Sequence, residues 1–308
     1  GCRRRSVQEP GFSSRRPGFA FSGPATVSHG MWLCPKTSTS ASGNAAAMRR
    51  SRPAALARLT GGVASHVSAA LWHGLPLPPR LARPAGLHLT FDRSARTHRT
   101  DLGGAVSHRV RLPSDHVLDL PDGQRVTTAA RTWFDLAGML RPHEVDWLIA
   151  AGDHLVRPPW TPTGRADPVA TVSELSEVLA RCRGRPGVRL ARAALTEVRV
   201  GADSPPETFL RLALIRAGLP EPELQAAIEP GDPFSPVADV AYRHVRLALQ
   251  YDGAGHRTRE QQARDARRDR YGQARGWTTL RVTWADGRED FRGVVAVVRR
   301  RLGHSAST

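Results

Sequence analysis

Hydrophobic and polar positions divide the chain into a polar N-terminal stretch and a patterned remainder. Residues 1–50 are rich in Arg, Ser, Gly and Pro, with Glu9 as their only acid, and show neither helical nor strand periodicity. Such a composition predicts a disordered tail. From about residue 51 apolar positions recur regularly, and alternation predicts strands at 87–91 and 106–112. Helical periodicity with capping residues predicts helices over 65–73, 127–137 and 142–155.

The next segment, 157–168, carries five prolines or glycines in PPWTPTGRADP and predicts a linker, because no regular element spans such a stretch. Thr171 and Glu174 then form a capping-box pattern that predicts a helix to about residue 183. A further helix is predicted over 188–196. We therefore expect residues 157–200 to be a linker and helical connector between two larger parts.

The C-terminal third alternates helices and strands and predicts a compact α/β unit over residues 201–303. Ser204 and Glu207 enclose two prolines, a pattern that predicts a helix start. Strands are predicted at 237–242 and 245–251, and the two residues between them predict a hairpin. The remaining predicted elements are a helix over 258–275, a strand over 277–283 and a basic helix over 291–302.

The net charge narrows the class of partner. The 308 residues carry 45 Lys and Arg against 28 Asp and Glu, a formal charge of +17, and Lys36 is the only lysine. A field of this size attracts nucleic acid or an acidic membrane. The alternative is an ordinary solvated surface in a protein whose overall composition favours arginine. The charge alone favours nucleic acid over the other polyanions.

Several classes of protein are excluded by composition. A hydrophobic content of 40% is adequate for a core, so a wholly disordered protein is excluded. No apolar run approaches the roughly 18–20 residues of a membrane span, and no leader-like apolar segment follows the early arginines. The three cysteines are too scattered for a disulfide framework or a zinc knuckle. We expect a cytoplasmic protein with no membrane partner, and Met31 and Met48 are alternative starts to Gly1.

The predicted hairpin brings oxygen-bearing side chains together. Period-2 geometry puts one set of side chains on a single face of the second strand, namely Arg246, Ala248, Gln250 and Asp252. Asp239 on the partner strand faces positions 248–250, and Glu207 arrives from the preceding helix. Carboxylate and amide oxygens are ligands for Mg²⁺ or Mn²⁺, which polarise a phosphodiester and activate a water. Asp239, Gln250 and Asp252 are the predicted metal ligands, and His256 is placed to contact a phosphate or carry a proton.

Simpler interpretations compete with this site. Glu207 stands where a capping residue stands, and Asp239 and Asp252 are also typical of turns and strand ends. Six histidines between residues 66 and 116 are too irregularly spaced to predict a zinc site. Arginines of the predicted helix and the last strand are either a solvated face or a track for a phosphate backbone; as DNA contacts they are Arg264, Arg267, Arg268, Arg275 and Arg281.

The C-terminal third resembles the domain of unknown function 559 over about residues 200–303. The resemblance rests on SPPETFLRLALIRAGLPEP, VADVAY, VRLALQYDGAGH, RDARRDR and GWTTLRVT, which occur in the family's order. It implies a very-short-patch-repair-like endonuclease with the PD-(D/E)XK fold, and site positions at Glu207, Asp239, 250, Asp252 and His256. Gln250 departs from the family, which usually has Glu there. Loss of that charge weakens a metal site, although the short-patch-repair relatives also lack an acid at this position.

A second resemblance covers the middle of the chain. SHVSAALWHGLPLP (65–78) and VTTAARTWFDLA (126–137) resemble motifs of the AbiEi family of antitoxins. That family often begins with a winged helix, which would fall in 1–50, and it implies a toxin as partner. The predicted division is thus a tail over 1–50, an AbiEi-like α/β region over 51–156, the connector and the nuclease-like unit.

Two functions follow from the sequence. The first is a metal-dependent DNA endonuclease of an α/β class that uses Mg²⁺ or Mn²⁺, in repair or defence. The second is a catalytically inactive DNA-binding or antitoxin-like regulator that retains the nuclease fold, as Gln250 favours.

Overall fold

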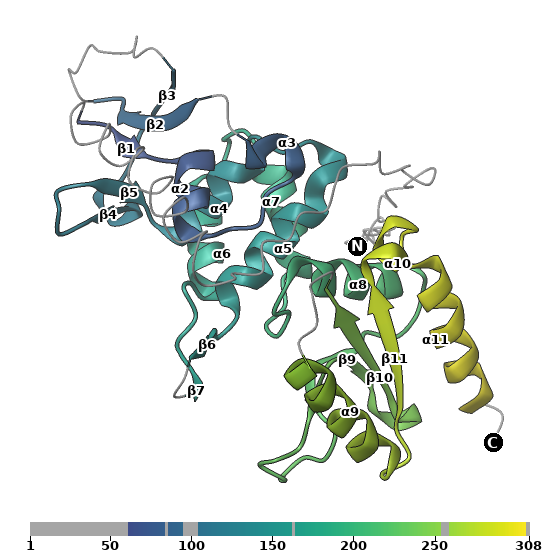
Figure 1. The fold of residues 1–308 in the computed structure, drawn as a ribbon. Coiled ribbons are helices and arrows are strands. Elements are labelled where there is room, and N and C mark those ends of the chain that lie inside the picture. The colour runs from purple at the N-terminus through teal and green to yellow at the C-terminus, as the bar shows by residue number, and fades with distance from the viewer. Residues whose placement is uncertain (1–60, 84–85, 95–103, 162–163, 254–258, 306–308) are drawn as a thin grey trace, which may run out of the picture.

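The computed structural model describes residues 61–83, 86–94, 104–161, 164–253 and 259–305. They form a five-stranded sheet with a group of helices, followed by a four-stranded sheet flanked by helices (Figure 1). Both sheets are mixed, which confirms the predicted α/β class. The predicted tail lies outside the described residues.

The N-terminal sheet has the strand order β3-β2-β1-β5-β4. Its strands are short and run antiparallel between β1 and β2 and between β4 and β5, but parallel between β2 and β3 and between β1 and β5. The bounds are β1 (Val63–Ala64), β2 (Leu87–Asp92), β3 (Ala105–Val110), β4 (Val117–Asp119) and β5 (Arg125–Thr127). A short helical turn, η1 (Ser114–His116), precedes β4.

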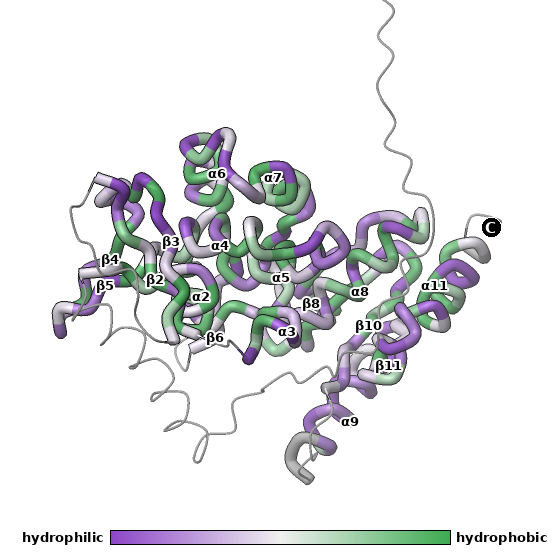
Figure 2. Tube along the Cα trace, turned by 90° about the horizontal axis from the view of Figure 1, so that it is seen from above, coloured by the Kyte–Doolittle hydropathy of each residue, from purple (hydrophilic) through white to green (hydrophobic). Residues whose placement is uncertain are grey.

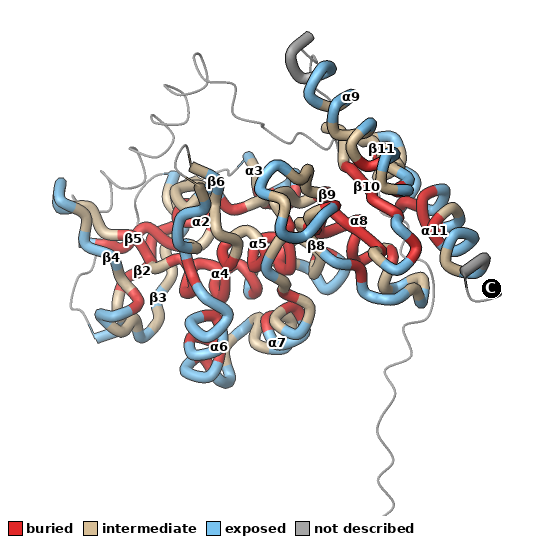
Figure 3. Tube along the Cα trace, turned by 90° about the horizontal axis from the view of Figure 1, so that it is seen from below, coloured by how far each residue is buried: buried red, intermediate tan, exposed pale blue. Residues whose placement is uncertain are grey.

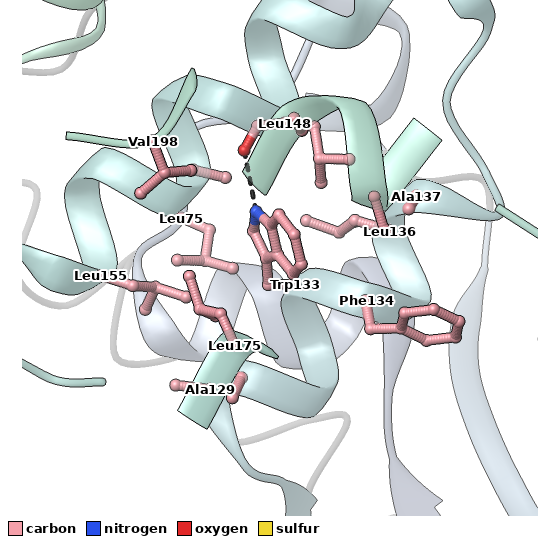
Figure 4. Packing of buried hydrophobic residues seen from close by; sticks show 14 of the residues in the cluster. Leu75, Ala129, Trp133, Phe134, Leu136, Ala137, Leu148, Leu155, Leu175 and Val198 are labelled. Carbon is pink, nitrogen blue, oxygen red and sulfur yellow. Dashed lines mark hydrogen bonds between the residues drawn. The ribbon is translucent and has the colours of Figure 1, made fainter. Parts of the chain in front are cut away.

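Helices from residues 66 to 197 share one core. Trp133 is fully buried at its centre, and its indole Nε1 donates a hydrogen bond of 2.9 Å to the carbonyl of Leu148 (Figure 4). The predicted connector supplies the last two helices of this core, which therefore pack against the preceding region. The elements are α2 (His66–His73), α3 (Pro79–Ala82), α4 (Ala129–Ala137), η2 (Pro142–Glu144), α5 (Val145–Val156), α6 (Val172–Arg181) and α7 (Val188–Glu197).

The C-terminal sheet has the order β11-β10-β9-β8, with β10 and β11 parallel and the other pairs antiparallel. Its strands are β8 (Glu223–Ala227), β9 (Val237–Tyr242), β10 (Leu247–Asp252) and β11 (Thr278–Thr283). Its helices are α8 (Pro205–Arg216), α9 (Arg259–Gln273), α10 (Trp284–Arg288) and α11 (Arg292–Ser305).

The two faces of this sheet are covered differently. Val240 and Leu249 point into an apolar core shared with α8 and α11. Ala241 and Ala248 point to the opposite face, toward Trp277 and the α9 side. Figure 3 shows α8 and β10 largely buried and α9 largely exposed, and Figure 2 shows α9 as mostly hydrophilic. The helix that follows the candidate site is therefore a polar outer layer.

Three predicted connections differ from the structure. The hairpin turn is longer than two residues, because a short helical turn, η3 (Arg243–Val245), and a left-handed Arg246 at φ 48° join β9 to β10. Neither Arg243 nor His244 favours the left-handed backbone of a two-residue turn. The predicted linker contains a small hairpin, β6 (Trp160–Thr161) and β7 (Gly164–Arg165). The basic helix predicted over 291–302 is preceded by the separate helix α10.

The helices of the described part of the chain are too short or too polar to cross a bilayer.

Candidate active site

Glu207 lies in the first turn of α8, where the prolines at 205 and 206 begin the helix. Its carboxylate accepts hydrogen bonds from the backbone N–H of Asp203 (2.8 Å) and from the hydroxyl of Ser204 (2.7 Å). The predicted capping box is not formed, since the Ser204 side chain caps no backbone N–H and Glu207 accepts from the backbone N–H of Asp203 rather than from that of Ser204. The side chain is 6% exposed, so it caps the helix and also projects into the interior.

Asp239 lies in β9 at an irregular point of the sheet. The neighbouring pairs, Leu224 with Val240 and Ala226 with Ala238, keep one register, but Gln225 between them has a left-handed backbone at φ 48°. Such a backbone is uncommon for a residue other than glycine and often marks a functional position. Asp239 Oδ2 accepts a hydrogen bond of 2.8 Å from the backbone N–H of Tyr251 on β10.

Gln250 follows directly after the last position at which β10 pairs with β9, Leu249 with Val240, and on its other side it pairs with Arg281 of β11. Its side chain is buried and is hydrogen-bonded to Asp239. The predicted alternation is confirmed here, since Leu247 and Leu249 lie in the α8 core and Ala248 on the α9 side. Asp252 ends the strand two residues later, half-buried and opposite Thr283 of β11.

The charge of the half-buried Asp239 acts on the buried carboxyl group of Glu207. Burial and the neighbouring charge of Asp239 raise the pKa of Glu207 to about 8. Burial raises the pKa of Asp239 to about 6, against the lowering effects of the Tyr251 hydrogen bond and the Arg268 charge. Two carboxyl groups that disfavour each other's ionisation accept a cation readily or else share protons.

Arg268 of α9 is the cation that faces this cluster. It lies close enough to Asp239 to lower its pKa, and it lines a cavity with Gln250. The cavity, of about 10 Å³, lies between α9 and the sheet and is large enough for about one water. Small side chains at Ala238, Ala248 and Gly272 leave this space open.

The donor chemistry of the cluster fits a hard divalent cation. Two carboxylates and an amide oxygen are oxygen ligands of the kind that Mg²⁺ and Mn²⁺ take. Burial is the larger cause of the raised pKa values of Glu207 and Asp239, and a bound cation would favour the ionised form of both groups. Within the described residues, no group of three or more His, Cys, Asp or Glu side chains is arranged to hold a metal. The amide of Gln250, which is hydrogen-bonded to Asp239, adds an oxygen ligand to the two acids but no charge.

The arginines predicted to contact DNA divide into two sets. Arg268 and Arg281 form ion pairs with Asp265, and Arg281 also binds Asp269 at 2.8 Å. Arg275 stacks on the Tyr271 ring, 3.6 Å from its centre. The second set, Arg264 and Arg267, is exposed on α9. His256 lies outside the described residues.

Three of the histidines that the sequence presents as scattered are stacked in the N-terminal unit. The rings of His66 and His108 lie 3.5 Å apart between centres, and those of His88 and His108 5.2 Å apart. Nδ1 of His88 and Nε2 of His108 are hydrogen-bonded at 2.9 Å. Pairing of β2 with β3 brings His88 beside His108, and His66 joins them from the start of α2, which spacing along the sequence alone does not reveal.

Sequence reasoning also missed the residues that surround Glu207. Asp203 binds Arg165 of β7 at 2.9 Å, and Arg165 reaches Gln225 at 3.2 Å. The sequence signal for this contact was an acidic residue, Asp203, directly before the helix cap Ser204. Its arginine partner lies 38 residues earlier, a separation that no local pattern connects.

Comparison with known proteins adds little beyond the geometry. No protein-family model matches the chain. Two matching proteins are the uncharacterized protein MT2308 of Mycobacterium tuberculosis strain CDC 1551 / Oshkosh and the uncharacterized protein Rv2248 of strain ATCC 25618 / H37Rv. Each is 33% identical over 131 residues, 42% of this chain and 48% of the relative. The chain thus spans about half the length of the curated relatives it matches. No solved structure matches it.

Proposed function

We propose that the C-terminal unit is a metal-dependent nuclease that hydrolyses phosphodiester bonds of DNA. The observation that carries this proposal is the buried Glu207 beside the half-buried Asp239, whose charge raises the pKa of Glu207, with Gln250 hydrogen-bonded to Asp239. A buried acid pair of this kind is costly to the fold unless a ligand uses it.

In this function Asp239 and Gln250 hold a Mg²⁺ or Mn²⁺ ion, with Asp252 as the third ligand expected from the sequence. The ion, when bound, polarises the phosphodiester and lowers the pKa of a water. Glu207 orients that water or serves as a further ligand, held in place by the bonds from Asp203 and Ser204. Arg268 offsets the negative charge on the α9 side, and His256 assists at the phosphate.

The charge of the surrounding surface supports DNA as the substrate. Residues 257–301 contain thirteen arginines against six acids. Arg264 and Arg267 are exposed on the outer side of α9. Contacts of arginine with phosphates fix the position of a duplex and make binding salt-dependent.

Plasmid cleavage tests the proposal. With Mg²⁺ or Mn²⁺ the full chain should nick or cut supercoiled DNA, and EDTA should stop the reaction. Asp239→Ala should abolish it. Unchanged activity in that variant would refute the assignment of the site.

A second candidate function is a DNA-binding regulator without catalysis, paired with a toxin protein as the AbiEi resemblance implies. The observation that favours it is Gln250, because a buried amide supplies no charge at a site that depends on charge. Such a protein would keep the basic surface and lose turnover.

The substitution Gln250→Glu separates the two functions. If only the glutamate variant cleaves DNA, the natural protein is a binding protein that retains the fold. If both cleave, the nuclease function holds. If neither the wild type nor the variant binds DNA in a salt-dependent way, both functions fail.

A further inference from the structure

The β6–β7 hairpin presents an aromatic ring beside the candidate site. Trp160 is 62% exposed, which is unusual for a large apolar side chain in an ordered strand. Four residues of sequence separate it from Arg165, yet the two are paired across the hairpin. The Arg165 guanidinium lies over the indole, 4.0 Å from the ring centre. One face of the exposed ring is therefore covered by a guanidinium whose charge is paired with Asp203.

Arg165 is held from the other side by the protein. Its guanidinium donates to the carboxylate of Asp203 (2.9 and 3.3 Å), to Gln225 (3.2 Å) and to the carbonyl of Pro158 (2.8 Å). These contacts fix the arginine, and through the stacked pair they fix the ring as well. The side chains of Trp160 and Arg165 are therefore already ordered, so a ligand that binds them loses little affinity to the entropy cost of fixing their rotamers.

The same contacts lead directly to the candidate site. The backbone N–H of Asp203 donates to Glu207 at 2.8 Å, and Gln225 is the left-handed residue of β8 beside Asp239. Trp160 is thus connected to Glu207 through Arg165 and Asp203, and Arg165 also reaches the residue of β8 that lies beside Asp239. The hairpin lies outside the part of the chain that resembles a nuclease, so that resemblance assigns it no role.

We infer that Trp160 and Arg165 form a nucleobase-stacking site, and that this site holds an unpaired base of the DNA strand bound by the Glu207–Asp239 cluster. The inference rests on the proposed nuclease function. Nucleobases stack on exposed aromatic rings irrespective of sequence. The guanidinium of Arg165 holds the ring of Trp160 in place for such stacking. A single DNA strand bound at the cluster offers an unpaired base.

Binding of a fluorescent single-stranded oligonucleotide to the full chain tests the inference without cleavage, in Ca²⁺ or EDTA. Trp160→Ala should weaken binding about tenfold or more, the magnitude of one lost base stack. Trp160→Phe should restore most of the affinity. The slope of log affinity against log salt should stay unchanged in Trp160→Ala, because no phosphate contact is lost.

Leu118→Ala is the matched control, since Leu118 is also an exposed apolar residue of a short strand but lies in the N-terminal sheet, away from α9 (Figure 1). It should bind like the wild type. If Trp160→Ala binds as the wild type does while Arg267→Ala binds more weakly, DNA binding stands and the stacking site is refuted. If the wild type does not bind DNA, the proposed function itself is refuted.

Discussion

Asp153 of α5 and Arg211 of α8 form an ion pair of 3.0 Å with both side chains excluded from solvent. The same carboxylate accepts hydrogen bonds from the Thr208 hydroxyl (2.8 Å) and the Arg199 backbone N–H (2.7 Å). The pair joins the helical core of the N-terminal part to the helix that carries Glu207. The candidate site is therefore supported by residues outside the C-terminal unit.

Loss of this carboxylate should destabilise the protein strongly. Asp153→Ala leaves the buried guanidinium of Arg211 with only a distant acid, Glu221 at 3.9 Å, and we expect a loss of about 3–5 kcal/mol in the free energy of unfolding. Asp146→Ala removes the partner of Arg216 in a largely exposed pair and should cost about 0–1 kcal/mol. Denaturant unfolding measures both, and equal losses would contradict the role given to Asp153.

The acid pair should make stability depend on pH in a definite direction. The pKa of Glu207 is about 8 in the folded chain and lies near its ordinary value of 4.5 in the unfolded chain. The folded state thus favours the protonated form of Glu207. The contribution of this group to the free energy of unfolding is largest below pH 4.5 and is lost as the pH rises toward 8. In EDTA, Glu207→Gln should gain stability relative to the wild type between pH 5 and pH 8.

Any packing cost of the substituted glutamine side chain that is independent of pH cancels in that comparison. Denaturant unfolding at the two pH values provides the measurement. Excess Mg²⁺ should reduce the difference at pH 8, because a cation also relieves the repulsion. A difference that stays constant with pH would show that Glu207 is an ordinary exposed acid in solution.

The histidine stack should have the opposite pH dependence. Burial, together with repulsion among the rings, lowers the pKa of His66 and His108 to about 3. Because the unfolded chain takes up these protons near pH 6.5, stability is lost as the pH falls below that value. His108→Gln should therefore lose less stability than the wild type between pH 7 and pH 5. The exposed His143→Gln serves as control, and an equal loss in all three proteins would refute the prediction.

Gly152 of α5 is a position where a better helix former should be harmful. A methyl group there would lie 2.4 Å from Cγ2 of Val198 and 3.2 Å from the indole nitrogen of Trp133. Gly152→Ala should destabilise the chain by about 1–3 kcal/mol through overpacking. Gly293→Ala in α11 meets no atom within 4 Å and should stabilise by up to about 1 kcal/mol. In thermal unfolding we expect the two substitutions to shift the melting temperature in opposite directions. Shifts in the same direction would contradict the close packing at Gly152.

Much of the C-terminal unit could be predicted because its signals are local. Alternation along β10 placed Gln250 on the face opposite Leu249, and the hairpin placed Asp239 beside it, whatever the length of the turn. The change from a two-residue turn to η3 left the pairing parity unaltered. The start of α8 was likewise visible in its prolines and Glu207.

What could not be predicted depends on contacts between distant segments. The irregular backbone at Gln225 arises in a strand with no clear alternation, and it is recognised only once β8 pairs with β9. The ion pairs of Arg281 with two acids of α9 draw a predicted DNA contact into the fold. The histidine stack and the Arg165–Asp203 pair likewise require the sheet and the hairpin to exist first.

Single-turnover nicking of supercoiled plasmid in Mg²⁺ tests the central claim most directly. The wild type should nick the DNA, and Asp239→Asn should lower the rate at least about a hundredfold, the usual cost of removing one group that stabilises the charge of a transition state. Asp119→Asn, at an exposed acid of the N-terminal sheet, should nick at the wild-type rate. Equal rates for the wild type and Asp239→Asn, or no Mg²⁺-dependent nicking by the wild type, would contradict a metal-dependent nuclease built on Glu207 and Asp239.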